Sequence, residues 1–138
     1  MSDHPPIDPA LKEAPYPFQE HLGFDLTHWN DGYARLEQKI EPYLMNRGGV
    51  PHGGMYTTLL DTVMGFAGLY SGDAERRKIG LTLTLNTSFL SRPRGTLLIA
   101  EGWKTGGGNR TFFAESVLTD ETGEKIATAS GAFRYRSE

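Results

Sequence analysis

The sequence predicts an α+β fold in which one curved antiparallel β-sheet wraps around one long, buried helix. The first reason is that the segment from Gly53 to Tyr70 has helical spacing and a single charged residue, Asp61. A surface helix normally shows a charged face, so a helix that is apolar or small nearly all round is expected to be buried. The second reason is that two strand-like segments precede this helix and four follow it, which segregates helix and strands along the chain.

Composition limits the possible classes of function. The chain has 138 residues, which suits one domain, and no cysteine, which excludes disulfides, a thiol nucleophile and thiolate metal ligands. The net charge of −3 argues against a general nucleic-acid-binding protein. The first residues lack the basic and apolar regions of a signal peptide, and no apolar run is long enough to span a membrane. We therefore expect a cytoplasmic protein that has neither nucleic acid nor membrane as a partner.

The segments before the central helix predict a tail, a short helix and two strands. Residues 1–15 are expected to form a mobile tail because their prolines oppose regular structure, and residues 16–138 are expected to form one domain. The segment Pro17–Gly23 predicts a short helix closed by a glycine, with Phe18 and Leu22 on one face. A strand over Gly23–Asn30, a turn at Asn30–Gly32 and a half-buried strand over Tyr33–Ile40 are expected to follow.

The segments after the central helix predict four antiparallel strands. Over residues 79–89, leucine alternates with threonine and other polar residues, which is the clearest strand pattern in the chain. The strand predicted over Thr96–Lys104 places Leu97, Ile99 and Trp103 on one face. Two more strands are expected over Arg110–Thr119 and Lys125–Tyr135, the last with Ala127, Ala129, Gly131 and Phe133 against the helix, and a solvated loop at Glu75–Lys78. Because a small sheet on one helix leaves its edges uncovered, an oligomer is expected.

Residues around the start of the central helix resemble a motif of the hotdog-fold acyl-CoA thioesterases, especially the branch with the phenylacetate-pathway enzymes. The motif residues are Asn46, His52, Gly53, Gly54 and Asp61. Later segments also resemble this family, at Asn86–Pro93, Gly95 and Asp120–Gly123, whereas Pro51 departs from the branch. The resemblance implies a hotdog fold, hydrolysis of an acyl- or aryl-CoA thioester, no cofactor beyond the coenzyme A of the substrate, and a homodimer or dimer of dimers.

Thioester hydrolysis needs hydrogen-bond donors for the developing oxyanion and a base or nucleophile. Gly53 and Gly54 suit the first role because glycine lets a carbonyl approach the backbone N–H, and the helix dipole adds to the polarisation. The resemblance implies that the Gly53 N–H is the donor, and an ordinary turn is the alternative. Asp61 suits the second role as an isolated acid, and the resemblance implies a base or a nucleophile. A solvent-facing aspartate is the alternative.

The spacing of these two groups predicts a shared site. Gly53 and Asp61 are eight residues apart in the sequence. At about 1.5 Å of rise per residue they lie about 12 Å apart along the helix axis. Both must lie within about 3 Å of the reacting group to act on it together. We therefore expect a dimer in which Gly53 comes from one protomer and Asp61 from the other.

Three further residues are candidates for supporting roles. Asn46 is expected either to orient the thioester or water through its amide or to make a local turn. His52 is expected either to donate to the thioester oxygen or to hold the entry to the helix. By resemblance, Thr82 matches a hydroxyl position that helps to place the attacking water, with a simple strand residue as the alternative.

The binding of the rest of the substrate is less specified. The coenzyme A half of the substrate carries phosphates, which pair well with guanidinium groups. Candidates to bind these phosphates are Arg92, Arg94 and Arg110, although exposed arginines are often only solvated. Met64 and Phe89 are candidates to line the acyl pocket, which suits either an aryl or an aliphatic group. The four histidines are scattered, so no metal site is expected.

Two other functions stay open at this point. A hotdog dehydratase acts on acyl-carrier substrates, but it uses a catalytic histidine paired with an acid in a different loop context. A non-catalytic acyl-CoA-binding module on the same fold usually carries a DNA-binding segment, and the tail of this chain is short and not strongly basic.

Overall fold

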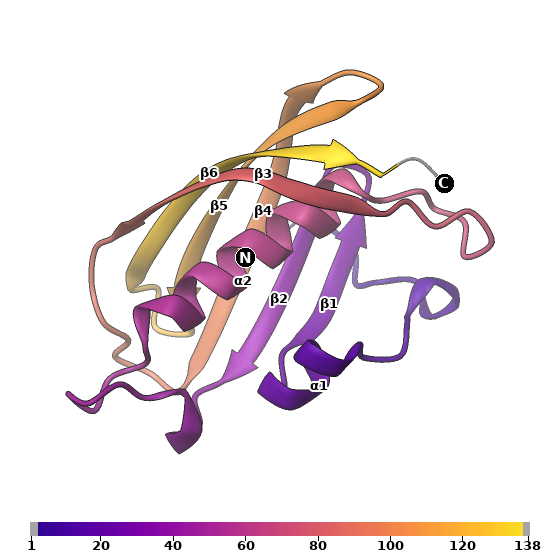
Figure 1. Ribbon diagram of the computed structural model, residues 1–138. Coiled ribbons are helices and arrows are strands. Elements are labelled where there is room, and N and C mark those ends of the chain that lie inside the picture. The colour runs from indigo at the N-terminus through magenta and orange to yellow at the C-terminus, as the bar shows by residue number, and fades with distance from the viewer. Residues whose placement is uncertain (1–2, 137–138) are drawn as a thin grey trace.

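The computed structural model describes residues 3–136. The start of the predicted tail, residues 1–2, and the end of the predicted domain, residues 137–138, lie outside the described residues. One six-stranded sheet, with every neighbouring pair antiparallel, curves around one long helix (Figure 1). This confirms the predicted α+β fold. The elements in chain order are η1 (Pro9–Leu11), α1 (Pro17–Leu22), β1 (Asp25–Asn30), β2 (Tyr33–Lys39), η2 (Pro42–Leu44), α2 (Gly53–Gly68), β3 (Gly80–Phe89), β4 (Leu97–Gly107), β5 (Thr111–Asp120) and β6 (Lys125–Tyr135).

The central helix α2 lies close against the sheet because the sheet presents small residues to it. A Cβ atom at Gly102 of β4 would lie 2.8 Å from the Val63 carbonyl oxygen, and one at Gly131 of β6 would lie 3.3 Å from Met64 Cε. This packing buries half of the helix in the core. The buried residues of α2 are Met55, Tyr56, Leu59, Leu60, Val63, Met64, Ala67 and Gly68.

Two side chains of the sheet satisfy carbonyl groups in the last turn of α2. The Trp29 Nε1–H donates to the Phe66 carbonyl at 2.7 Å, and the Tyr135 hydroxyl donates to the Gly68 carbonyl at 3.2 Å. The last carbonyls of a helix have no partner within it, and a buried carbonyl left unpaired is unfavourable. These bonds therefore fix the C-terminal end of α2 to β1 and β6.

The strand order is β1-β2-β4-β5-β6-β3, which puts β3 at an edge of the sheet. After α2, the chain forms β3 at the edge of the sheet opposite β1, where β3 pairs with β6. The consecutive strands β3 and β4 are therefore not neighbours. Figure 1 shows β3 crossing in front of α2 beside β6. Within residues 3–136, one long side of β3 therefore has no strand partner.

In β4, the shared face predicted for Leu97, Ile99 and Trp103 is the outer face of the strand. The residues turned to the core are Leu98, Ala100 and Gly102, all fully or nearly fully buried, whereas Trp103 is 38 % exposed. The reason is the close approach of α2, because the Gly102 position has no room for a side chain. Small residues therefore mark the inner face of this strand better than large apolar ones do.

The alternation along β3 also fails to identify a buried side. Leu81 and Leu83 are 58 % and 52 % exposed, whereas the Thr82 side chain reaches toward α2. The register of β3 against β6 shifts between Thr82 and Thr84, so the residues that face the helix change parity there. By contrast, β6 presents Ala129 and its small neighbours to α2 as predicted.

The segment before α1 contains more structure than its prolines suggest. Pro9–Leu11 forms a 3₁₀ turn, so the prediction that prolines exclude regular structure is wrong there. A proline at the first position of a helical turn loses no hydrogen bond, since that N–H is unpaired anyway. The Ile7 N–H donates to the Thr27 carbonyl at 2.9 Å, and Ile7 packs against the core. The boundary at residue 16 stays a prediction.

The helix α1 ends at Gly23 in the left-handed conformation, as predicted. Its apolar face is different from the predicted one, because Gln19 is buried and Phe18 is 53 % exposed. The Gln19 side chain is accommodated by donating to the Phe24 carbonyl at 3.2 Å. Within residues 3–136, no helix is long and apolar enough to cross a membrane.

Replacing Gly68 by alanine is expected to destabilise the protein. The new Cβ would lie 2.0 Å from a ring atom of Phe112, so ring or helix must move, and overpacking of this kind costs about 1–3 kcal/mol. The measurement is the free energy of unfolding in urea. Gly65→Ala is the matched control on the same helix, since no atom lies within 4 Å of its new Cβ, and it is expected to gain about 0.5–1 kcal/mol from helix propensity. Equal stability of the two variants would contradict the close packing.

Candidate active site

The charged residue of α2 lies beside the edge strand. Asp61 Oδ1 accepts a hydrogen bond from the Thr82 hydroxyl of β3 at 2.8 Å, so the structure brings together two of the predicted site residues. Burial raises the pKa of the Asp61 carboxyl, and the Thr82 hydrogen bond lowers it in part. Partial burial with one hydrogen bond leaves a carboxylate that accepts a proton more readily than one in water, as a general base must.

A cavity of about 470 Å³ opens beside this pair. It lies between α2, the start of β3 and the segment before α1, and its wall combines aromatic with polar side chains. The lining residues include Tyr16, Trp29, Asp61, Phe66, Thr82 and Phe133. The carboxylate thus faces a space large enough for part of a small organic substrate.

Tyr16 belongs to this cavity, although no local sequence pattern marks it. Burial raises the pKa of its phenol, the Thr62 side chain lowers it in part, and the nearby Asp61 carboxylate raises it further. Tyr16 precedes α1 and is forty-five residues away from Asp61 in the sequence. Only the folding of the N-terminal segment against α2 brings these two groups together, so no local motif could have revealed the pair.

The two glycines at the start of α2 differ in what their N–H groups do. The Gly54 N–H donates to His52 Nδ1 at 2.7 Å, which makes His52 the N-cap of the helix. Among the hydrogen bonds of residues 3–136, the Gly53 N–H has no acceptor. Gly53 is therefore the available donor, whereas the Gly54 N–H is already occupied. Because His52 Nδ1 accepts, the neutral ring carries its proton on Nε2.

Asn46 shapes the loop before the helix. Its side-chain oxygen accepts from the Gly48 N–H at 2.8 Å and from the Val50 N–H at 3.3 Å. This is the local turn that the sequence offered as one alternative. The bonds fix the loop that delivers His52 and Gly53 to the start of α2.

The two predicted pocket residues occupy different surroundings. Phe89, at the end of β3, lies over the start of α2, where a Cβ at Gly53 would be 3.2 Å from its ring, and is 58 % exposed. Met64 is fully buried in the core between α2 and β6. Phe89 therefore lies beside the free Gly53 N–H, whereas a substrate would reach Met64 only after other side chains moved.

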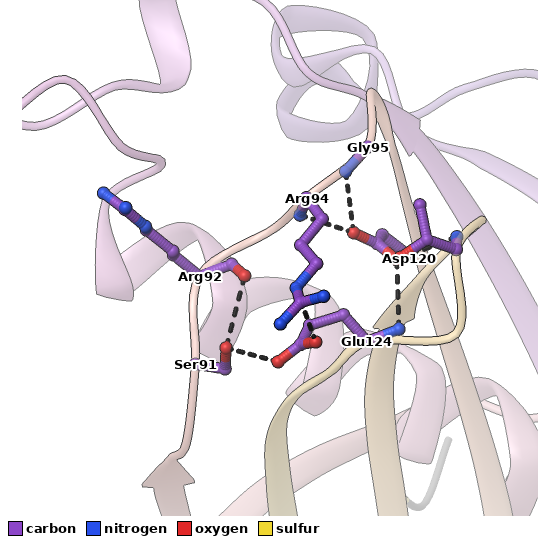
Figure 2. Close-up of polar contacts among 7 residues, drawn as sticks. Ser91, Arg92, Arg94, Gly95, Asp120 and Glu124 are labelled. Carbon is purple, nitrogen blue, oxygen red and sulfur yellow. Dashed lines mark hydrogen bonds and ion pairs between the residues drawn. The ribbon is translucent and has the colours of Figure 1, made fainter.

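The predicted arginines do not gather in one place. Figure 2 shows the Arg94 guanidinium turned toward Glu124, with 3.1 Å between Arg94 Nε and a Glu124 oxygen, while Arg92 extends away from this pair. Both lie in the β3–β4 connection, whereas Arg110 follows β4 at its opposite end. A strand of this length spans about 33 Å, which separates Arg110 from the other two.

The β3–β4 connection is held by a buried carboxylate. Asp120, only 2 % exposed, accepts from the N–H groups of Arg94 and Gly95 at 2.7 and 2.8 Å (Figure 2). Burial alone would raise its pKa, but hydrogen bonds from Thr122, Gly95 and Arg94 outweigh burial and hold the pKa well below the usual range. This part of the resembling motif thus has a structural role. No group of three or more metal-ligating side chains gathers anywhere in residues 3–136.

Comparisons with known proteins agree with this architecture. A family model described as the thioesterase superfamily matches residues 48–127, more than half of the chain. A Mycobacterium tuberculosis protein named as a putative esterase is 26 % identical over 125 residues, which cover 88 % of each chain.

Solved structures share the fold. A conserved protein of Pseudomonas aeruginosa superposes with a TM-score of 0.80 at 24 % identity, covering 88 % of this chain and 94 % of that one. The PaaI protein from the phenylacetic acid degradation operon of Escherichia coli superposes with a TM-score of 0.76 at 17 % identity, covering 87 % and 84 %. At these identities the likeness shows the fold alone, and it confirms the predicted hotdog fold.

Replacing Asp120 by asparagine is expected to destabilise the protein by about 3 kcal/mol, because hydrogen bonds to a charged acceptor are lost in a buried place. Since the folded pKa is depressed, the ionised carboxyl stabilises the fold above its unfolded value near 3.8, and this contribution is lost as the pH falls below that value. Urea unfolding should therefore show a difference from the wild type that is full at neutral pH and narrows in strong acid. Asp31→Asn, at an exposed turn, is the control, and an equally small effect at both positions would refute this role.

Proposed function

Because the chain belongs to the thioesterase superfamily, we propose that it hydrolyses acyl- or aryl-CoA thioesters to the free acid and coenzyme A, at a site shared by two copies of the chain. One observation carries this proposal. The unpaired Gly53 N–H and the Asp61 carboxylate, which accepts from Thr82 of β3, lie on the same helix but too far apart to meet one carbonyl group.

Each group suits one part of the reaction. A thioester oxygen placed on the Gly53 N–H would be polarised by that donor and by the positive end of the α2 dipole. Asp61 would either remove a proton from the attacking water or attack the carbonyl carbon itself, forming an acyl anhydride that water then hydrolyses. In both cases the carbon–sulfur bond breaks and coenzyme A leaves as the thiol, with its proton coming from water. Through its hydrogen bond, Thr82 keeps Asp61 in place. Phe89 would cover the acyl end beside Gly53.

The distance along α2 supports the use of two chains. Eight residues at about 1.5 Å each separate Gly53 from Asp61 by about 12 Å, more than the reach of an aspartate side chain. In a two-fold dimer, the same helix of each copy contributes its start to one site and its middle to the other. Two equivalent sites result.

The edge of the sheet supports such a dimer. In β3, Leu81 and Leu83 are more than half exposed, and at its end so are Phe89 and Leu90. An uncovered edge strand with several exposed apolar side chains favours pairing with another chain. Since Thr82 lies in the same strand, a partner bound at this edge would stand next to Asp61.

Asp61→Asn is expected to lower kcat by about a hundred- to ten-thousandfold, because it removes the base or nucleophile. The measurement is thiol release from a panel of acyl- and aryl-CoA esters with a thiol reagent. Circular dichroism checks that the variant is folded. Full activity of this variant, or no turnover of any thioester by the wild type, would contradict the proposal, and coenzyme A binding without turnover would indicate a binding module instead.

The pH dependence of kcat tests the Thr82–Asp61 bond. Since burial raises the pKa of Asp61, the acid limb of the profile is expected above the ordinary carboxyl value of 3.8. Thr82→Val removes a hydrogen bond that lowers this pKa, so its acid limb should move to higher pH. Thr119→Val in β5, away from Asp61, should leave the limb in place. If the acid limb of Thr82→Val did not move, Thr82 would have no role in setting the pKa of the catalytic group.

Mixing two inactive variants tests the shared site. Gly53→Pro removes the unpaired N–H and adds a side chain beside Phe89. Proline itself is tolerated at the first helical position, and the preceding His52 already has an extended backbone at φ −61° and ψ 138°. Gly53→Ala is the matched control that keeps the N–H. Refolding Gly53→Pro together with Asp61→Asn should restore about a quarter of the wild-type activity, since half of the dimers are mixed and each has one intact site. If the site lay within one chain, no activity would return.

A further inference from the structure

A second, larger cleft lies at the other end of α2 from Gly53. It has a volume of about 1200 Å³ and lies between the α2–β3 loop and the ends of β4 and β6. The loop joins β6 through the Arg136 N–H, which donates to the Ile79 carbonyl at 2.8 Å. Figure 1 shows this loop near the end of β6. The lining residues are Ala74, Glu75, Arg76, Arg77, Lys78, Ile79, Lys104, Gly108, Asn109, Tyr135 and Arg136.

The cleft is strongly basic in a protein of net charge −3. Five cationic side chains and one acidic side chain line it. Arg76 and Arg77 are paired with Asp73 and Glu13 at 3.7 and 3.2 Å, respectively. The other three cations, Lys78, Lys104 and Arg136, have no ion pair within residues 3–136. The charged loop at residues 75–78 therefore forms one wall of a concave site rather than a merely solvated turn.

Two of these cations are held over one aromatic ring. The Lys78 and Lys104 ammonium groups lie 5.7 and 5.9 Å from the centroid of the Tyr135 ring, and Lys104 also donates to the Tyr135 hydroxyl at 3.2 Å. The tyrosine ring attracts both cations and helps to hold them in the wall of the cleft. A phosphate or diphosphate bound in the cleft would pair with these ammonium groups.

The basic cleft continues into the cavity of Asp61. Arg77, Lys78 and Ile79 line both spaces. Lys78 precedes Thr82 by four residues, which corresponds to a distance of about 13 Å along an extended chain. The pantetheine arm between the sulfur and the first phosphate of coenzyme A has the length of roughly four extended residues, about 15 Å. A thioester at Asp61 would thus bring its phosphates to Lys78.

We propose that this cleft binds the phosphate groups of coenzyme A, with Lys78, Lys104 and Arg136 as their partners, an inference that rests on the proposed function. In this role the cleft replaces Arg94, which is already paired with Glu124. Arg92 and Arg110 stay predictions for the same role. The pantetheine arm would lie along the start of β3.

Binding measured without turnover tests the cleft. Isothermal titration of coenzyme A into Lys78→Gln/Lys104→Gln is expected to give a Kd about ten- to a hundredfold higher than the wild type, because two phosphate partners are lost. Pantetheine, which has no phosphate, should bind both proteins equally. Lys78→Arg/Lys104→Arg should keep most of the affinity, and Lys39→Gln, an exposed lysine at the end of β2, should keep all of it. An unchanged Kd for coenzyme A, or an equal loss for pantetheine, would overturn the proposal.

Kinetics separate a failure of the cleft from a failure of the proposed function. With an acyl-CoA, the Gln/Gln variant should show KM raised about tenfold with kcat little changed, whereas an N-acetylcysteamine thioester of the same acid should show neither change. Equal changes with both esters would refute the cleft while leaving the thioesterase intact. The wild type could bind coenzyme A yet hydrolyse no thioester, while the Gln/Gln variant loses that binding. This result would support the cleft and refute the hydrolase.

Discussion

The close approach of α2 to the sheet governs the rest of this structure. Glycines at 102 and 131 bring strand backbones against the helix, and at Gly68 the Phe112 ring occupies the place of a side chain. A helix packed this tightly has little room for polar groups on its sheet-facing side, because a buried polar atom needs a partner. Its single carboxylate therefore has to lie where the packing is open, and that place is the side facing the edge strand.

The position of Asp61 follows from this constraint. A charged carboxylate within the core would be strongly unfavourable, but beside β3 it receives the Thr82 hydroxyl and faces a cavity. The same reasoning applies to the start of the helix. His52 caps Gly54 and leaves the Gly53 N–H unpaired, at a point where Phe89 shields it on one side. Both polar features of α2 therefore lie where the sheet leaves the helix accessible.

The sequence predicted the elements better than their faces. The glycine at the end of α1 and the near absence of charge along α2 were sufficient to predict these two helices, since both signals are local. The pattern of β4 did not tell its inner side from its outer side, because Gly102 faces the helix while the larger Trp103 faces outward. The register shift after Thr82 has no signature in an alternation of leucine and threonine. Tertiary contacts decide each of these, including the Tyr16–Asp61 proximity, so local patterns could not supply them.

The edge strand β3 links the separate parts of the proposed site. It carries Thr82 on the side that faces Asp61, exposed leucines where a second copy would bind, and Lys78 just before its start. In the proposed enzyme, this one strand would contribute to dimer formation, to the position of Asp61 and to the binding of coenzyme A. Its Thr82 is exposed in the single chain and would be covered by a partner, which would further desolvate the Asp61 carboxylate. A single copy would then lack both the oxyanion donor and the environment of the base, so dimerisation would complete the chemistry as well as the fold.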